Sequence, residues 1–237
     1  MASVVHIACS ARADNKIIEA IAIERGHHIV ATIGREGIAS HAMENVDCVI
    51  EFSRPEAALD NMQSCMENNL KMVIGTTGWH DHESKVNAWV QAHEGTLVHA
   101  SNFSLGVNLF FKLNAQLAQW MSPFEAYTPQ VSECHHTDKL DQPSGTAISL
   151  AQGILPTYPK LEGWSLEASD NQLSIDATRV PDVPGTHEVH YRSKQDSLSI
   201  KHEAHSREGF ALGAVIAAEM AQDLHGMHRF SDLLFPQ

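Results

Sequence analysis

Hydrophobic and polar positions in the N-terminal part of the chain follow two alternating patterns. Short apolar runs bounded by polar or turn residues are typical of buried strands, and apolar residues three or four positions apart are typical of amphipathic helices. The runs predict strands at 4–9, 29–33, 48–52, 72–74 and 97–100. The helical spacing predicts helices at 15–25, from Pro55 onward, and through Val86, Trp89 and Val90. Strands that alternate with helices favour a doubly wound parallel sheet, whose ligands bind beyond the carboxyl ends of the strands.

A different pattern begins after Asn102. A long amphipathic helix is predicted by the helical spacing of Val107, Phe110, Leu113, Leu117 and Trp120. Two segments of alternating polarity, 187–192 and 198–205, predict strands of an antiparallel or mixed sheet with one covered face. A final helix at about 210–224 is rich in small apolar residues, and we expect it to return to the first domain.

Together the patterns predict an α/β protein of two domains. The first is a Rossmann-like doubly wound parallel sheet formed by residues 1–103 and 210–237, the organisation of a dinucleotide-binding domain. The second, residues 104–209, is an α+β domain with an open mixed sheet, which we expect to hold the substrate.

Composition and charge limit the class of partner. The chain has 237 residues, enough for two small domains with cores, and its formal net charge of −13 argues against nucleic acid or an anionic membrane. No window approaches the ~18 apolar residues of a membrane span, and no basic and apolar leader is present. The four cysteines have no paired spacing, which fits a reducing compartment. We therefore expect a cytoplasmic protein that binds a small molecule.

Residues 133–147 contain the richest chemistry of the chain. His135, His136 and Lys139 are followed by Ser144-Gly145-Thr146, directly ahead of an apolar segment that predicts a helix. Imidazole and ammonium groups are proton donors, and the start of a helix binds anions through its N–H groups. The stretch therefore favours a site that holds and protonates a small anionic substrate.

Several motifs resemble, in order and spacing, those of the 4-hydroxy-tetrahydrodipicolinate reductase (dihydrodipicolinate reductase) family. They are residues 51–56, 73–79, 101–108, 135–147, 183–188 and 205–211. The resemblance implies reduction of a cyclic dicarboxylate, 4-hydroxy-tetrahydrodipicolinate, to tetrahydrodipicolinate in lysine and diaminopimelate biosynthesis. It implies NADPH or NADH as cofactor, and a homotetramer built through the sheet of the second domain.

The resemblance also implies the roles of individual residues. His135 and Lys139 match the proton-handling pair of the family, and His136 matches a substrate contact. Ser144, Gly145 and Thr146 match the residues that hold a substrate carboxylate. The residues that match the lining of the nicotinamide side of the cofactor are Gly75, Thr76, Thr77, Ala100, Ser101, Asn102 and Phe103.

Two positions depart from the family pattern. The family has a glycine-rich phosphate turn after the first strand, and this chain has Ala11, Ala13 and Lys16 there, without the glycines that admit the pyrophosphate. The acidic position that binds the ribose is Gly34 here, followed by Arg35. The Arg35 guanidinium favours the 2′-phosphate of NADPH, although a solvated surface charge explains it equally well.

Two alternatives follow from these residues. The altered turn permits a dicarboxylate-binding protein that has lost cofactor binding and catalysis. The 16 histidines, with Cys134 beside His135 and His136, raise the possibility of a metal site. Neighbouring residues of an extended segment point to opposite faces, so these three side chains do not readily bind one ion, and we expect no metal. Glu133 either orients a histidine or is solvated.

Overall fold

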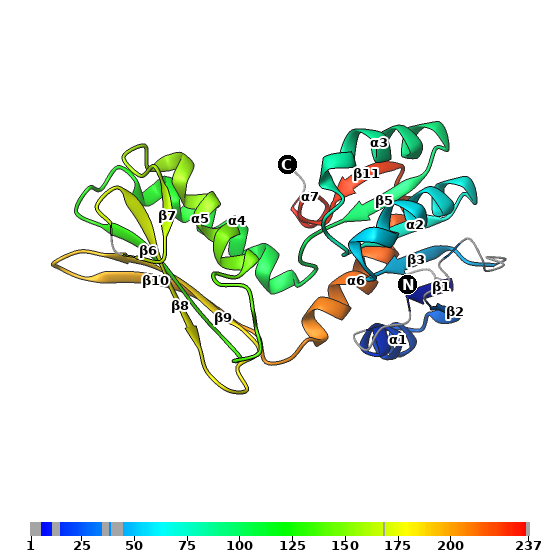
Figure 1. Cartoon of the computed structure of the whole chain (residues 1–237), viewed down its shortest axis with the longest axis horizontal. Helices are drawn as coiled ribbons and strands as arrows, with labels where there is room; N and C mark the ends of the chain where they lie inside the picture. The colour runs from blue at the N-terminus through cyan, green and yellow to red at the C-terminus, as the bar shows by residue number, and fades with distance from the viewer. Residues whose placement is uncertain (1–5, 11–14, 35–37, 39–44, 168, 236–237) are drawn as a thin grey trace. The chain divides into compact units, whose positions relative to one another are not determined.

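The computed structural model describes residues 6–10, 15–34, 38, 45–167 and 169–235. The chain divides into two compact units (Figure 1). Unit 1 consists of residues 1–105 and 208–237, and unit 2 of residues 106–207.

Unit 1 contains a parallel sheet of six strands in the order β11-β5-β4-β3-β1-β2. The strands are β1 (His6–Ser10), β2 (His28–Ile33), β3 (Cys48–Glu51), β4 (Lys71–Ile74), β5 (Thr96–His99) and β11 (Gly226–Arg229). Strands β3 and β5 are buried along their whole length, as expected for a parallel sheet with both faces covered. The predicted Rossmann-like sheet is confirmed.

Helices cover both faces of this sheet. They are α1 (Asn15–Glu24), α2 (Pro55–Glu67), α3 (Glu83–Ala92), α6 (Glu208–Met220) and α7 (Phe230–Leu234), with short 3₁₀ turns η2 (His80–His82) and η4 (Ala221–Asp223). Side chains of α1, α6 and α7 form one core with Val73, and side chains of α2 and α3 form another with Met72 and Ile74. The two cores follow from the alternation of side chains along β4.

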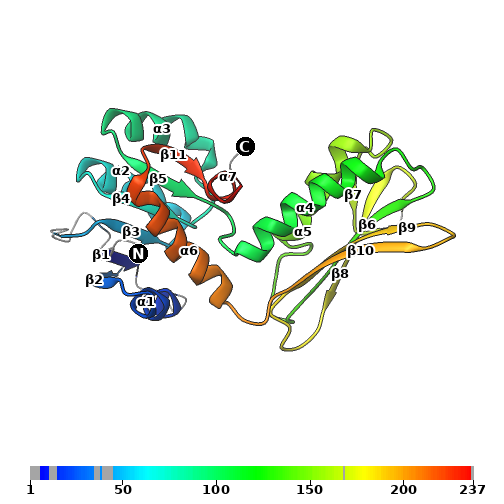
Figure 2. The ribbon, with the colours of Figure 1, turned by 180° about the vertical axis from the view of Figure 1, so that it is seen from behind.

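Helix α6 returns to unit 1, as predicted, and packs against α1, which Figure 2 shows from behind. Two features allow α6 to pack closely against other parts of unit 1. A Cβ atom at Gly213 would lie 1.7 Å from the carbonyl oxygen of Phe103, so only glycine fits where α6 crosses that segment. Arg25 donates to both carboxylate oxygens of Glu219 at 2.7 and 2.8 Å, and His27 Nε2 lies 2.8 Å from Glu219 Oε1.

Unit 2 contains a mixed sheet of five strands in the order β10-β9-β6-β8-β7. The strands are β6 (Thr128–His135), β7 (Gly163–Ser165), β8 (Gln172–Arg179), β9 (Thr186–Arg192) and β10 (Ser197–Glu203). The helices are α4 (Leu105–Met121) and α5 (Gly145–Ile154), with the 3₁₀ turn η3 (Leu155–Thr157). Leu150 and Ile154 of α5 are buried in one core with Val131 and Val189 of the sheet, which gives the predicted single covered face.

The buried side of α4 agrees with the prediction only in part. Val107 and Phe110 are buried as predicted, but Leu113 and Trp120 are 48% and 63% exposed. The face that packs on the core carries Asn114 and Ala118 in their place. Asn114 is buried because its Nδ2 donates to the carbonyl oxygen of Leu150, 2.9 Å away, so a polar and a small residue allow close contact with α5.

No helix in the described part of the chain has both the length and the apolar character needed to span a bilayer.

Candidate active site

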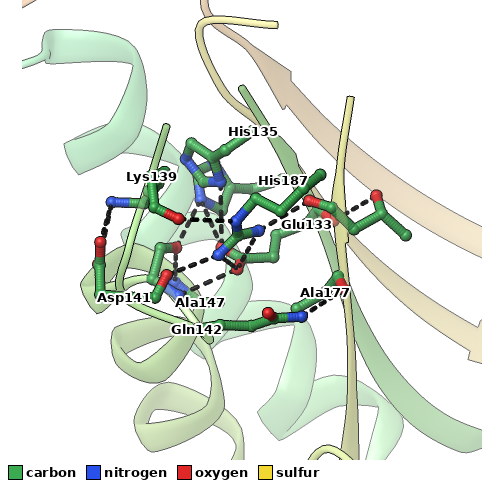
Figure 3. A network of polar contacts seen from close by, with 11 residues as sticks. Glu133, His135, Lys139, Asp141, Gln142, Ala147, Ala177 and His187 are labelled. Atoms are coloured by element: carbon green, nitrogen blue, oxygen red, sulfur yellow. Dashed lines mark hydrogen bonds and ion pairs between the residues drawn. The ribbon is translucent and has the colours of Figure 1, made fainter. Parts of the chain in front are cut away.

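Strand β6 brings the central polar residues of unit 2 together. Its side chains alternate between buried and half-buried, and Glu133 and His135 lie on the buried face. The antiparallel pairing with β9 places His187 opposite Glu133, and the parallel pairing with β8 places Arg179 opposite His135. Figure 3 shows the side chains of Glu133, His135 and His187 directed toward one another. Three strands therefore contribute to one cluster.

Glu133 is the centre of this cluster and is only 3% exposed. Its Oε1 accepts hydrogen bonds from the backbone N–H of Ser144 at 3.0 Å and from both terminal nitrogens of Arg179 at 3.3 Å. Its Oε2 lies 3.3 Å from His135 Nδ1 and 3.7 Å from His187 Nε2. Burial raises the pKa of the Glu133 carboxyl, but the contacts with His135 and Ser144 outweigh burial and lower this pKa to about 2. The carboxylate is therefore ionised at neutral pH.

His187 is a neutral member of the cluster. Burial, followed by the positive charge of nearby His135, lowers the pKa of His187 to about 4. The His187 Nε2 lies 3.2 Å from the hydroxyl of Ser144, and its ring meets the His135 ring edge to face at 4.9 Å. The Ser144 hydroxyl, which accepts a hydrogen bond from Ala147 N, thus connects His187 to the start of helix α5.

Helix α5 begins where the sequence places a carboxylate-binding turn. Ser144 is its N-cap, with its hydroxyl accepting from the N–H of Ala147 at 3.2 Å. Gly145 and Thr146 are the first helical residues, and their N–H groups have no partner within a helix. Gly145 is exposed, and a Cβ atom there would meet nothing within 4 Å. Two N–H groups at the positive end of a helix dipole thus border open space, which suits an anion.

Lys139 lies beside the cluster with its ammonium directed elsewhere. Its Nζ lies 2.8 and 2.9 Å from the two carboxylate oxygens of Asp141, as Figure 3 shows, and the hydrogen bond from Lys139 lowers the pKa of Asp141. The Lys139 carbonyl accepts from Arg179 Nε at 3.3 Å. His136 follows β6 and is half-buried. The proton-handling role of His135 with Lys139 stays a prediction, because Lys139 here pairs with Asp141.

Sequence reasoning gave no place to Arg179 and His187, and left open whether Glu133 orients a histidine or is solvated. Glu133 is not solvated, because it is buried by the covering helix and by Arg179. Arg179 also donates to the carbonyl of Asp141 at 2.6 Å, so it fastens the loop that carries Lys139 to the sheet. The alternation of side-chain direction along an extended segment was the one signal in the sequence for these residues. It does not reveal which strands are neighbours.

Glu133, His135 and His187 offer ligand atoms that all lie within 4.8 Å of one another, a spacing that suits a metal ion. The sequence did not predict this grouping, because His187 comes from another strand. The guanidinium of Arg179 contacts the same carboxylate at 3.3 Å, and its positive charge opposes a second cation there. The cluster is therefore better suited to proton chemistry.

In unit 1, the segments predicted to line the nicotinamide follow adjacent strands. Gly75, Thr76 and Thr77 follow β4, and Ala100, Ser101, Asn102 and Phe103 follow β5. The N–H of Ala100 donates to the carbonyl of Ile74 at 3.3 Å. Parallel strands end at the same edge, so the two segments form one rim at the position where doubly wound sheets bind nucleotides.

A third segment, after β3, joins this rim. The N–H of Ser53 donates to the Thr76 hydroxyl at 2.8 Å, and the N–H of Gly75 donates to the carbonyl of Glu51 at 2.9 Å. A Cβ atom at Gly75 would lie 2.0 Å from the ring of Phe52, so glycine is required for the chain to pass that ring. Thr77 is exposed at the rim. These residues leave backbone without large side chains at the rim, which suits a flat ligand that lies directly against it.

Other residues of the predicted cofactor site lie partly outside the described residues. Ala11, Ala13 and Arg35 belong to the part of the chain that is not described. Lys16 is in the first turn of α1 with its side chain exposed, and Ile18 makes the buried contact of this helix instead. Lys16 therefore does not interfere with the packing of α1 on the sheet.

Comparison with known proteins extends over both units. Residues 3–103 match the family model described as dihydrodipicolinate reductase, N-terminus, and residues 106–234 match the one described as dihydrodipicolinate reductase, C-terminus. The 4-hydroxy-tetrahydrodipicolinate reductase of Christiangramia forsetii is 45% identical over 220 residues, which are 92% of each chain.

Two solved structures show the same fold. A dipicolinate-bound dihydrodipicolinate reductase from Paenisporosarcina sp. TG-14 has a TM-score of 0.79 at 18% identity, covering 98% of this chain and 100% of that one. An amine dehydrogenase from Mycobacterium smegmatis has a TM-score of 0.58 at 9% identity, covering 97% and 96%. With both family models matched in order and a curated relative similar along nearly its whole length, the chain belongs to the dihydrodipicolinate reductase family.

Proposed function

We propose that this protein reduces 4-hydroxy-tetrahydrodipicolinate to tetrahydrodipicolinate, with a pyridine nucleotide as the reductant. The observation that carries the proposal is the 45% identity to the Christiangramia forsetii reductase across both units. The buried cluster of unit 2 supports it, because it combines an imidazole, an ionised carboxylate and a helix start. We assign the nucleotide to unit 1 and the substrate to unit 2.

The residues of unit 2 have complementary tasks in this proposal. The N–H groups of Gly145 and Thr146, with the Thr146 hydroxyl, bind a carboxylate of the substrate, and Ser144 keeps the start of the helix in place as its cap. His136 contacts the substrate from the end of β6. The ammonium of Lys139 adds positive charge near the dianionic substrate once it leaves Asp141.

His135 supplies the proton. A pyridine nucleotide held by unit 1 would supply a hydride to one carbon of the substrate, and the electron pair left on the substrate would then need a proton. An acid placed at that atom typically contributes ~10²–10⁴-fold to the rate. His135 is the suitable donor, because its Nδ1 faces Glu133 and its other ring nitrogen is turned away from the carboxylate.

The decisive test combines kinetics with calorimetry. We expect the purified protein to oxidise NADPH or NADH only when the substrate is present, and isothermal titration to detect nucleotide binding. Dicarboxylate binding without nucleotide binding or oxidation would contradict the proposal and would identify a binding protein instead. The measurement also decides whether Ala11, Ala13 and Lys16 still permit cofactor binding.

We further propose that NADPH is preferred over NADH. The support is the pair Gly34 and Arg35, which replaces a ribose-binding carboxylate by a guanidinium suited to a 2′-phosphate. The preference is measured as the ratio of kcat/KM for the two nucleotides. Arg35→Ala should lower this ratio by weakening NADPH alone, and an equal effect on both nucleotides would contradict the assignment.

The assembly we propose is a homotetramer built through the uncovered face of the unit 2 sheet. Along β6 the residues of that face, such as Gln130 and Ser132, are half-buried rather than fully exposed. Light scattering coupled to gel filtration should give a mass four times that of the chain. A monomer at micromolar concentration would contradict this assembly.

A further inference from the structure

The two oxygens of the Glu133 carboxylate have different surroundings. Oε1 accepts from Arg179 and from the N–H of Ser144, which together satisfy a buried charge and join the sheet to α5. Oε2 is buried and has no conventional hydrogen bond among the described residues. It faces two imidazoles, His135 Nδ1 at 3.3 Å and His187 Nε2 at 3.7 Å. The structural role of Glu133 is therefore met by Oε1, and Oε2 needs another explanation.

His187 does not account for Oε2. Its Nε2 is closer to the Ser144 hydroxyl, at 3.2 Å, than to the carboxylate. At 3.7 Å from Oε2, His187 Nε2 is also beyond hydrogen-bond distance. His135 is therefore the nearer candidate partner of Oε2, since its Nδ1 lies 3.3 Å away and has no hydrogen-bond partner among the described residues.

The opposite side of the His135 ring is kept clear by the backbone of Gly185. A Cβ atom at Gly185 would lie 3.0 Å from His135 Nε2 and 3.2 Å from Cδ2. Any other residue would therefore press against the nitrogen that is not turned to Glu133. His135 is thus held between a carboxylate at Nδ1 and a residue without a side chain at Nε2.

We propose that Glu133 is a positioning residue that keeps the proton of neutral His135 on Nδ1, so that Nε2 exchanges a proton with the substrate beside Gly185. This inference rests on the proposed reductase function. A carboxylate that accepts from one ring nitrogen fixes the tautomer and the orientation of the imidazole. In the reduction, the Nε2–H bond of protonated His135 breaks and the proton joins the substrate atom that carries the electron pair. Neutral His135 then keeps Nδ1–H toward Glu133 and regains a proton from water.

The test compares Glu133→Gln with Glu188→Gln. Glutamine keeps the size of residue 133 and an oxygen for Arg179 and Ser144, but loses the negative charge at His135. Glu188 is the matched control, because its Oε2 lies 3.7 Å from His190 Nε2 on the same sheet, outside the cluster. We expect Glu133→Gln to lower kcat about 100-fold with KM for the substrate changed less than about threefold. Glu188→Gln should keep both constants.

A second readout does not depend on activity. The ¹⁵N chemical shifts of the His135 ring report which nitrogen carries the proton. We expect Nδ1–H in the unaltered protein and in Glu188→Gln, and a shift of the population toward Nε2–H in Glu133→Gln. If the unaltered protein shows no nucleotide oxidation, the proposed function fails, and these shifts still test the arrangement of Glu133 and His135.

Three results would overturn the inference. The first is an unchanged tautomer in a folded Glu133→Gln protein. The second is a loss of activity that follows only the fraction of unfolded protein, because it would make Glu133 purely structural. The third is a stoichiometric metal ion in the purified protein that Glu133→Gln loses, because it would make the cluster a metal site.

Discussion

At the residue scale, the groups around the imidazole of His135 determine how this residue can transfer a proton. His135 has Glu133 at one ring nitrogen and the bare backbone of Gly185 at the other. Sequence pattern identified His135 as a candidate acid, because a histidine pair before a helix start is unusual. Glu133, which orients it, lies two residues earlier on the same face of β6, whereas Arg179 and His187 come from other strands and depend on the register of the sheet.

Gly185→Ala tests the open side of His135. The added methyl group would lie 3.0 Å from Nε2, so we expect kcat to fall at least ~10-fold through obstruction of proton transfer. The ¹⁵N shifts of His135 should still report Nδ1–H, since Glu133 is unchanged. Gly185 also has a positive φ of 156°, so the control is Gly26→Ala, where φ is likewise positive at 88° and a Cβ atom meets nothing within 4 Å. Unaltered kcat in Gly185→Ala would show that Nε2 is not the reacting atom.

Lys139→Ala tests the second predicted proton-handling residue. We expect kcat to fall far more than KM rises, by ~10²-fold or more, if the ammonium acts in the transition state. Asp141→Asn is the companion variant, because it removes the partner that holds the ammonium at 2.8 Å and should leave kcat within a few fold. A change in KM alone for Lys139→Ala would assign Lys139 to binding only.

The buried His187 makes stability depend on pH. Its folded-state pKa is lowered from 6.5 to about 4 by burial and by His135. The unfolded chain takes up this proton near pH 6.5, and the folded chain only near pH 4. Acidification between these values therefore lowers the free energy of unfolding by on the order of 3 kcal/mol, and above pH 6.5 the contribution is constant.

Urea unfolding at a series of pH values from 7.5 to 4 measures this effect. His187→Gln removes the titrating group, so we expect its free energy of unfolding to fall less steeply over the same range. The difference in slope between the two proteins isolates His187 from the other groups that titrate there. Equal slopes would show that His187 takes up its proton equally readily in the folded and unfolded chains.

At the element scale, the contact between α1 and α6 joins residues from opposite ends of the chain. Glu219 of α6 binds Arg25 and His27, which follow α1. The hydrogen bond from Arg25 is the main reason that the pKa of Glu219 is lowered. We expect Glu219→Gln to reduce the free energy of unfolding by about 1–2 kcal/mol, because it removes a charged partner of two side chains.

The matched control for Glu219 is Glu67→Gln on α2 of the same unit. Glu67 is exposed and accepts a hydrogen bond from Gln63 at 2.7 Å. Its replacement should cost less than about 0.5 kcal/mol. Chemical denaturation followed by circular dichroism compares the two variants, and equal losses would contradict a specific role for the Glu219 contact.

The predicted elements were most accurate where the covered face is entirely apolar. Among the described residues, the strands of unit 1 before residue 100 and helix α1 were predicted within one or two residues, and α2 and α3 were predicted without full bounds. Strand β6 was not predicted, because its covered face carries Glu133 and His135 beside Val131 and so lacks the expected apolar alternation. Strand β11 is short and has no fully buried residue, so it leaves no pattern to recognise.

At the scale of the whole molecule, the proposed ligands belong to different units. Nucleotide-lining residues lie in unit 1, and the cluster around Glu133 lies in unit 2. Changes confined to one unit should therefore affect the binding of one ligand.

Replacing Ala11, Ala13 and Lys16 by glycine restores the phosphate turn of the family, and we expect tighter nucleotide binding with dicarboxylate affinity nearly unchanged. Titration calorimetry with each ligand measures both, and unchanged nucleotide affinity would show that the turn was not limiting.

The sequence by itself determined the family, the α/β class, the buried strands of unit 1 and the stretch that contains His135 and Ser144. Each of these depends on local spacing or on motifs that are contiguous in the chain. Only the tertiary structure brought Arg179 and His187 to Glu133 and His135, because Glu133 and Arg179, for example, are 46 positions apart and meet through the pairing of β6 with β8. It also decided which side of α4 is buried. Contacts between strands depend on register and order, and these follow from the packing of the whole domain rather than from any single segment.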